Sequence, residues 1–150
     1  MKKALKVYIA PKGTSGVRKE QKELILKKDY GIRGDKFAGK KLEQSVMIVG
    51  DIAYKIAKEN GIALPEAALG ENILLNFDPH TLNIGDRLQI GSAILEISLA
   101  CTLCNHLLVY DKRLPKLILK HRGIYCKVVK DGIIKAEDKV ILLESEVIKG

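Results

Sequence analysis

The sequence predicts a mainly β domain of short strands with a few short helices, arranged as a closed or partly open β-barrel. Two observations lead to this fold class. The apolar segments are short and separated by glycine-containing turns, and only one stretch has clear helical spacing of its apolar residues. The chain has 150 residues, of which 47% are hydrophobic. That is enough for one buried core, so we expect a single domain over residues 1–150.

The first third of the chain is expected to place strands around a glycine-rich loop. Partial alternation predicts a strand over Leu5–Ala10, a loop over Lys12–Gly16 and a short strand over Lys22–Leu26. The stretch Tyr30–Gly39 contains three glycines and is expected to be a flexible loop. The apolar run Ser45–Val49 predicts a buried strand.

One helix is expected in the middle of the chain. Gly50–Glu59 has apolar residues at positions 52, 53, 56 and 57, which is a helical spacing. Asp51 is expected to cap its start, and Asn60-Gly61 suits its end. Glu66–Leu69, after Pro65, is expected to add a helical turn.

The remaining strands are expected to be joined by tight turns. Asp131-Gly132 is the strongest short hairpin signal in the chain, because both residues tolerate the backbone that a two-residue turn requires. The strands expected here are Asn72–Leu75, Leu88–Ile90, Ile94–Ile97, Ile124–Val129, Ile133–Ile134 and Val140–Leu143. A further helix is expected from Leu107 onward.

Positive charge is concentrated at the start of the chain. The net charge is +8, and residues 1–41 hold 13 Lys or Arg against 4 Asp or Glu. Such a region attracts nucleic acid, a phosphorylated small molecule or an acidic partner, or it is simply a solvated lysine-rich surface. Trp is absent and aromatic residues make up 5% of the chain, so nucleic-acid binding by base stacking is the least favoured of these.

The cysteines and the N-terminus favour a cytoplasmic protein. There are three cysteines, an odd number, and the basic residues Lys2 and Lys3 are not followed by the apolar core of a signal peptide. No apolar run reaches the roughly 18 residues of a membrane-spanning helix, so no membrane association is expected.

The segment Cys101–His106 carries the most informative chemistry. It follows an expected strand and precedes an expected helix, where backbone N–H groups and the helix dipole favour a thiolate. Cys104 is the candidate nucleophile or metal ligand, and His106 could hydrogen-bond to it or share the metal. Cys101 is expected to be a small buried residue. A structural zinc site is an alternative, although His121 and Cys126 lack the usual spacing of zinc ligands.

A second candidate site is the loop Gly31–Gly39. Its successive backbone N–H groups could form an anion-binding nest, to which the cations add charge. The candidate residues here are Arg33, Gly34, Asp35 and Lys36. The loop lacks the Gly-Lys-Ser/Thr ending of a nucleoside triphosphate-binding P-loop.

Three polar residues lie at expected strand entrances. Glu71 and Asn72 follow Gly70, and Arg122 precedes Gly123. Each could bind a ligand directly, or could hold turns together through structural hydrogen bonds.

Taken together, these segments resemble the MOSC domain, named for the C-terminal part of molybdenum cofactor sulfurases. The resemblance runs from about Val7 to Leu143 in the family's order, and Cys104 falls on the family's cysteine. The pieces that carry it are Gly31–Gly39 followed by Gln44-Ser45-Val46, Gly70-Glu71-Asn72-Ile73, Leu82–Gly91, and Arg122-Gly123-Ile124-Tyr125 with Val128, Gly132 and Asp138. Phe37 and Glu137 stand where the family commonly has His and Gly.

The resemblance implies a β-barrel that binds the molybdenum cofactor, molybdopterin. It also implies that Cys104 ligates molybdenum or carries sulfur as a persulfide, and both roles need a thiolate. Motif position makes the following residues candidates for contacting the cofactor: Arg33, Gly34, Asp35, Lys36, Glu71, Asn72, His106 and Arg122.

The resemblance leaves the activity open. The chain is expected to transfer sulfur, to take part in a molybdenum-dependent reductase system, or to handle the cofactor without catalysis. A molybdoenzyme or a sulfur donor protein is the expected protein partner. The alternatives are a non-enzymatic binding module for the cofactor or for an acidic partner, and a nucleic-acid-binding barrel whose affinity would fall with salt.

Overall fold

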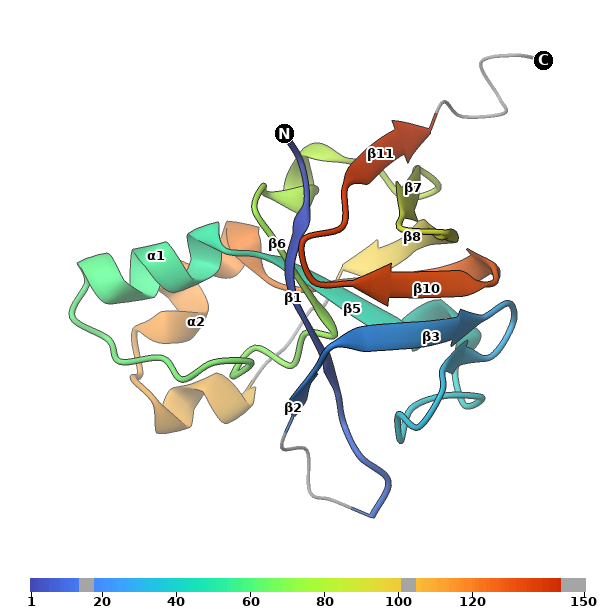
Figure 1. Cartoon of the computed structure of the whole chain (residues 1–150). Helices are drawn as coiled ribbons and strands as arrows, with labels where there is room; N and C mark the ends of the chain where they lie inside the picture. The colour runs from blue at the N-terminus through green and yellow to red at the C-terminus, as the bar shows by residue number, and fades with distance from the viewer. Residues whose placement is uncertain (14–17, 101–104, 144–150) are drawn as a thin grey trace.

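Two β-sheets form most of the molecule. The computed structural model describes residues 1–13, 18–100 and 105–143, without the side chains of Asn105 and His106. The strands are β1 (Ala4–Ile9), β2 (Lys19–Gln21), β3 (Glu23–Lys27), β4 (Gly31–Ile32), β5 (Val46–Gly50), β6 (Ile73–Leu75), β7 (Arg87–Ile90), β8 (Ala93–Ala100), β9 (Ile124–Lys130), β10 (Gly132–Lys135) and β11 (Val140–Leu143). Figure 1 shows the strands on one side of the molecule and the two α-helices on the other.

The helices are short and lie mostly in the second half of the chain. Two are α-helices, α1 (Ile52–Glu59) and α2 (Leu114–Leu117). The others are the 3₁₀ helices η1 (Leu42–Gln44), η2 (Pro79–Thr81), η3 (Asn105–Val109) and η4 (Leu119–His121). None of the helices in the described ranges is long and apolar enough to span a membrane.

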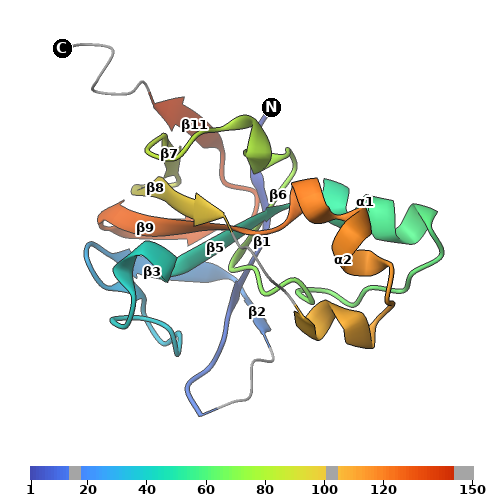
Figure 2. The same ribbon diagram turned by 180° about the vertical axis from the view of Figure 1, so that it is seen from behind.

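The larger sheet has eight strands in the order β11-β7-β8-β9-β5-β6-β1-β2, and the smaller has three in the order β10-β3-β4. All pairs are antiparallel except β5 with β6, which are parallel and connected through α1. The chain enters the small sheet at Lys22, between β2 and β3, and again at Asp131, between β9 and β10. Figure 2 shows the same arrangement from behind.

The prediction of a mainly β fold with few short helices is confirmed, but a closed barrel is not found. Within the described residues, the two end strands of the large sheet, β11 and β2, do not pair with each other. The small sheet packs against the large one instead, and both contribute residues to one hydrophobic core. The fold is therefore a pair of packed sheets.

The hairpin predicted at Asp131-Gly132 is also wrong. Only Asp131 separates β9 from β10, and β10 pairs with β3 and not with β9. One edge of β9 is paired with β8 along its length. On the other edge, β5 pairs with Ile124–Cys126 and the Val128 carbonyl accepts from the Asp29 N–H at 3.3 Å. The Asp131 carboxylate accepts a hydrogen bond from the Lys28 backbone N–H at 2.6 Å, so this connection joins the two sheets.

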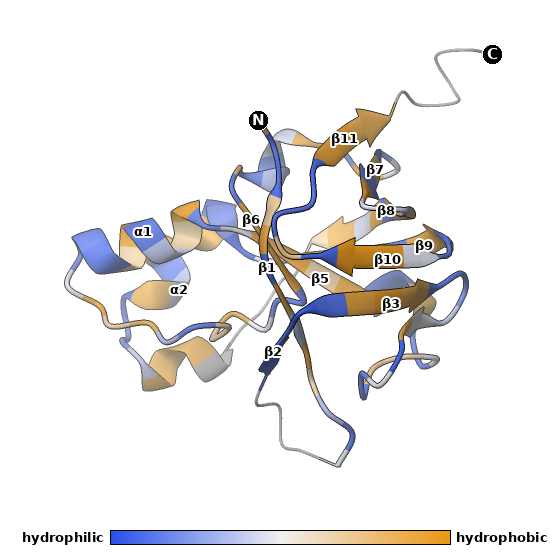
Figure 3. Cartoon of the chain, in the orientation of Figure 1, coloured by the Kyte–Doolittle hydropathy of each residue, from blue (hydrophilic) through white to orange (hydrophobic). Residues whose placement is uncertain are grey.

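Strand β5 is buried on both faces, as its uninterrupted apolar sequence predicts. Val46 and Ile48 face the core between the sheets, and Met47 and Val49 face a second core beneath the helices. Figure 3 shows apolar residues concentrated on the strands, with hydrophilic residues on the outer parts of the helices. Because β5 joins both cores, its end is held rigidly where the candidate site lies.

Two expectations for the helical region are corrected. Asp51 precedes α1 but has helical backbone angles and makes no capping hydrogen bond; its carboxylate lies 3.4 Å from Lys55 Nζ. A side chain on a residue that is already helical cannot turn back to the free N–H groups of the first turn. Residues 66–69 form turns without a helix, and Ala67 there has a φ of 60°.

Candidate functional site

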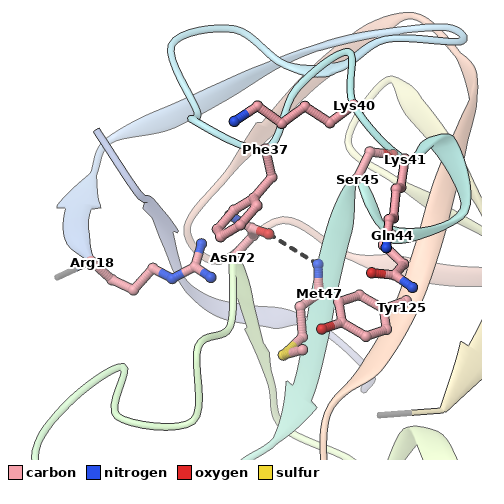
Figure 4. Close-up of a pocket in the computed structure, with 9 residues that line it drawn as sticks. All are labelled: Arg18, Phe37, Lys40, Lys41, Gln44, Ser45, Met47, Asn72 and Tyr125. Atoms are coloured by element: carbon pink, nitrogen blue, oxygen red, sulfur yellow. Dashed lines mark hydrogen bonds between the residues drawn. The ribbon is translucent and has the colours of Figure 1, made fainter. Parts of the chain in front are cut away.

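A pocket of about 230 Å³ opens between the start of β2, the Gly31–Gly39 loop and the ends of β5 and β9. Its lining is basic and polar above an apolar floor. The residues are Arg18, Phe37, Lys40, Lys41, Gln44, Ser45, Met47, Asn72 and Tyr125. Figure 4 shows the Arg18 guanidinium pointing inward from one side, with Gln44 and Tyr125 on the opposite side.

Arg18 is the most unusual side chain of the pocket. It is only 11% exposed, and its Nη1 lies 3.6 Å from Asp35 Oδ1. That nitrogen is buried and has no hydrogen-bond partner among the described residues. The guanidinium also lies 5.4 Å from the centre of the Phe37 ring. Burial lowers the pKa of Arg18, while Asp35 and Glu71 favour its charged form. A buried cationic donor with an unused hydrogen bond is suited to an anion.

Asp35 holds the Gly31–Gly39 loop against the end of β1. Its side chain is 1% exposed and accepts hydrogen bonds from the backbone N–H groups of Ala10 at 2.7 Å and Phe37 at 3.0 Å. A third donor, Asn72 Nδ2, lies 3.3 Å from Oδ1. These hydrogen bonds fix Phe37 and orient Arg18, so Asp35 builds the wall of the pocket.

Asn72 ties β1 to β5 just before β6 begins. Its Oδ1 accepts from the Met47 N–H at 2.9 Å, and its Nδ2 donates to the Tyr8 carbonyl at 3.1 Å. The first of these bonds is drawn in Figure 4. Donor and acceptor groups of the amide are both used within the protein. Asn72 therefore mainly holds β1 and β5 together, although it also lines the pocket.

Glu71 lies buried beside the pocket, between β1 and α1. Both of its carboxylate oxygens accept from the Tyr54 hydroxyl, at 2.9 and 2.7 Å. Burial raises the pKa of Glu71, whereas the Tyr54 hydrogen bond and the Arg18 charge act in the opposite direction. The Glu71 side chain is fully buried.

The floor of the pocket depends on a glycine. A Cβ atom on Gly123 would lie 2.5 Å from Met47 Sδ, so a side chain there would require the Met47 side chain to move. The absence of that side chain lets the Met47 thioether reach the pocket. Gly70 has a φ of +83°, which L-residues with side chains rarely adopt, and it sets the turn that leads into Glu71.

The predicted site residues do not all come together. Asp35 and Asn72 share the pocket wall, and Lys36 lies near it, with Nζ 5.1 Å from the Phe37 ring. Arg33 instead lines a separate groove over β3 and β10. Gly34 is exposed in the loop with a φ of +83°. Arg122 is buried, and its Nη2 donates to the Pro115 carbonyl at 3.3 Å.

The structure does not test the roles predicted for the segment Cys101–His106. Cys101, Cys104 and the side chain of His106 lie outside the described residues. The last residue of β8, Ala100, pairs with Ile124, next to the pocket residue Tyr125. Cys126 is fully buried, which raises the pKa of its thiol and makes it unreactive.

Sequence reasoning missed the residues with the strongest potential for binding. Arg18, Lys40 and Lys41 were recognised only as part of the basic first quarter of the chain. Gln44 and Tyr125 lie in the segments that resemble the family but were not singled out. The described residues contain no group of three or more metal-binding side chains, and the side chains of Cys101, Cys104 and His106, on which the zinc alternative depends, lie outside them. Among the described residues, His121 Nδ1 is 2.8 Å from Asp78 Oδ2.

Two packed sheets with a basic pocket at one end of the central strands define a small β domain with one partly buried arginine in that pocket. A model of the MOSC domain matches residues 36–141, most of the chain, so the chain belongs to the MOSC family. No curated protein matches it.

Solved bacterial structures share the fold. A YuaD protein from Bacillus subtilis is 22% identical with a TM-score of 0.77, covering 93% of this chain and 94% of its own. YiiM from Geobacillus stearothermophilus is 17% identical with a TM-score of 0.71, covering 96% and 76%. YiiM from Escherichia coli is 19% identical with a TM-score of 0.67, covering 96% and 70%.

Proposed function

We propose that this chain binds the molybdenum cofactor and acts as a cofactor-handling protein or sulfur carrier through Cys104. MOSC domains are associated with handling of this cofactor, and the chain belongs to that family. The observation that carries the proposal is the Arg18 guanidinium. One of its nitrogens is buried with no hydrogen-bond partner in the described residues, and the side chain lines a pocket that also holds Lys40 and Lys41.

The pocket fits one end of the cofactor in chemical terms. The cofactor carries a phosphate, and an arginine fork with two nearby lysines provides both hydrogen bonds and charge for such a group. Phe37 and Tyr125 supply flat surfaces, and Met47 an apolar floor. When bound, the cofactor supplies a molybdenum–dithiolene centre for sulfur or redox chemistry. Arg18, Lys40 and Lys41 would hold its anionic end.

In this proposal Cys104 supplies the thiolate that ligates molybdenum or carries a persulfide. A thiolate is the form of cysteine that binds soft metals and attacks sulfur. Cys104 follows β8 in the chain, and β8 pairs with the part of β9 that contains Tyr125. The proposal thus combines a described anion pocket with a cysteine that stands outside the described residues.

The test is elemental analysis of protein purified from a molybdenum-replete host, with released pterin measured by fluorescence. Wild-type protein is expected to contain both molybdenum and pterin. Arg18→Met is expected to lose both, because the anionic end of the cofactor is no longer held. Cys104→Ala is expected to lose molybdenum or the persulfide, and Cys101→Ala serves as the matched control.

Two results would change the proposal. Wild-type protein without molybdenum or pterin would contradict it. Full cofactor content in Cys104→Ala would instead favour a non-enzymatic binding module, since the described lining of the pocket contains no cysteine.

A further inference from the structure

We propose that the outer face of residues 107–117 is a docking surface for an acidic protein partner. These residues run from η3 through a short turn into α2. They carry three adjacent exposed apolar side chains beside a groove lined by cations. The inference goes beyond the proposed function, because it depends on exposure and charge at this surface and not on what the Arg18 pocket binds.

The core takes up only one side of this segment. Leu107 and Leu114 are fully buried and pack with residues of α1 and β5 in the second core. The apolar side chains between them point outward and are exposed, Leu108 by 52%, Val109 by 80% and Tyr110 by 38%. Adjacent exposed apolar side chains are typical of an interaction surface, whereas single ones are common on any protein.

A basic groove lies next to these apolar residues. About 510 Å³ is enclosed between side chains at the start of α2, namely Lys112, Arg113, Lys116 and Leu117. The elements η3 and α2 are in contact, and Figures 1 and 2 show them beside each other, away from most of the strands. Apolar contact area and positive charge therefore occur on the same surface.

Two lysines of the groove keep their charge free for a partner. Asp111 is the only acidic residue between positions 105 and 121, and it is paired with Arg113 at 3.0 Å. Arg113 also donates to the Asn60 carbonyl at 3.1 Å, which connects α2 to the end of α1. Lys112 and Lys116 are exposed and form none of the ion pairs found among the described residues. Carboxylates of a partner would complement them.

Charge and shape favour an acidic protein over two other occupants. A second copy of the chain in a two-fold dimer would place the same lysines opposite each other, and like charges repel. A lipid surface is flat and offers no side chain that fills a groove. A protein with carboxylates around an apolar contact would complement both the groove and the apolar residues.

The surface is close to the candidate cysteine along the chain. Val109 is five residues after Cys104, so their Cα atoms are within about 18 Å of each other in any conformation. A partner docked on η3 and α2 would thus be near the residue proposed above to carry sulfur or bind molybdenum. The docking itself does not require that role.

The first test is photo-crosslinking in cells of the source organism, with p-benzoylphenylalanine placed at single exposed positions. At Val109 we expect one main cross-linked protein, with a net negative charge. The control is the same substitution at Ile84, which is 72% exposed in the turn before β7. It should not give this product, because Ile84 lies outside the proposed surface.

The second test measures binding between the two purified proteins by titration calorimetry. The double variant Lys112→Gln, Lys116→Gln should raise the Kd at least about tenfold, and the wild-type Kd should rise with salt. The matched control is Lys130→Gln, Lys135→Gln, which removes the same charge from exposed lysines on β9 and β10. It should change the Kd less than about twofold, because screening weakens the effect of distant charges.

The apolar part of the surface has its own variant. Val109→Ser should raise the Kd at least about fivefold, as expected when apolar contact area is lost from an interface. Ile84→Ser removes an equally exposed apolar side chain elsewhere and should leave the Kd unchanged.

Three results would overturn the inference: no cross-linked protein at Val109, a product formed only with lipid or with a second copy of this chain, or equal weakening of binding by the two lysine pairs. Cofactor content tests the proposed function separately, and molybdenum and pterin in Lys112→Gln, Lys116→Gln should equal wild type. Wild-type protein that binds the partner but contains no cofactor would support this inference and contradict the proposed function.

Discussion

Two sides of the same pocket differ in how completely their polar groups are used. On one side, Asp35 and Asn72 have hydrogen bonds to backbone groups of β1, β5 and the Gly31–Gly39 loop. On the other, Arg18 has a buried nitrogen that forms an ion pair with Asp35 but has no hydrogen-bond partner among the described residues. The saturated side holds the pocket together, whereas the unsaturated side is available to a ligand. Burial alone therefore does not identify a binding residue; the unfilled hydrogen bond does.

The two sides of the pocket also differ in where their residues lie relative to the segment that matches the family model. Asn72 lies within the segment that matches the MOSC model, residues 36–141, and Asp35 directly precedes it. Arg18 lies well outside that segment. The residues at the centre of the family pattern form the scaffold of the pocket. Arg18 comes from a part of the chain that the family model does not cover, whereas Lys40 and Lys41, which line the same pocket, lie within it.

The largest effect is expected from a substitution that removes hydrogen bonds on the side of the pocket formed by Asp35 and Asn72. Asn72→Ala leaves the Met47 N–H and the Tyr8 carbonyl buried without partners. It should lower the free energy of unfolding by about 3 kcal/mol in a urea titration. Asn76→Ala is the matched control, because Asn76 also bonds two backbone groups, of Lys3 and Met1, but closer to solvent. Equal losses in the two variants would contradict the structural role of Asn72.

An intermediate effect is expected from a substitution of Arg18, on the side of the pocket with the unfilled hydrogen bond. Arg18→Met keeps most of the side-chain volume but removes the charge and the unused donor. The affinity for sulfate as a probe anion, measured by titration calorimetry, should fall about tenfold or more, as expected for a lost charged hydrogen bond. The free energy of unfolding should change less than in Asn72→Ala, because the cost of burying a cation is removed at the same time. Arg33→Met, in the outer groove, should leave sulfate binding unchanged; an equal loss there would show a diffuse charge effect.

The smallest effect is expected from relieving backbone strain outside the pocket. It tests whether that strain alters sulfate binding in the pocket. Glu137 has a φ of 74°, a conformation that favours glycine. Glu137→Gly should stabilise the protein by up to about 1 kcal/mol, because relief of strain outweighs the loss of an exposed ion pair with Lys3. Thermal unfolding measures this gain, and Glu137→Ala, which retains the strain, should show none. A change in sulfate affinity in either variant would show that the two regions are coupled.

Local sequence patterns were sufficient for most of the secondary structure. The helical spacing of Gly50–Glu59 corresponds to α1, and the turn at Gly91-Ser92 joins the paired strands β7 and β8. The pattern at Asp131-Gly132 failed as a hairpin because pairing depends on which strand edges are free, and local sequence does not contain that information. The closed barrel failed for the same reason.

The candidate site was less accessible to sequence reasoning. The positions of Asp35 and Asn72 near a ligand pocket could be expected from their motifs. Arg18 could not, because only the antiparallel pairing of β1 with β2 brings it back to the Gly31–Gly39 loop. Arg18 stands out because one of its buried nitrogens has no hydrogen-bond partner in the described residues. Only the three-dimensional packing shows this.

Residues near the two ends of the described chain are joined directly. The N–H of Ala4 donates to the Asp138 carbonyl at 2.9 Å, and the N–H of Val140 donates to the Lys2 carbonyl at 2.9 Å. During synthesis on the ribosome, the first strand therefore waits for nearly the whole domain to emerge before these bonds can form. Strand β1 can pair earlier with β2 and β6, but its first residues complete their hydrogen bonds only when the last strands appear, so closure of the domain is a late, long-range step in folding.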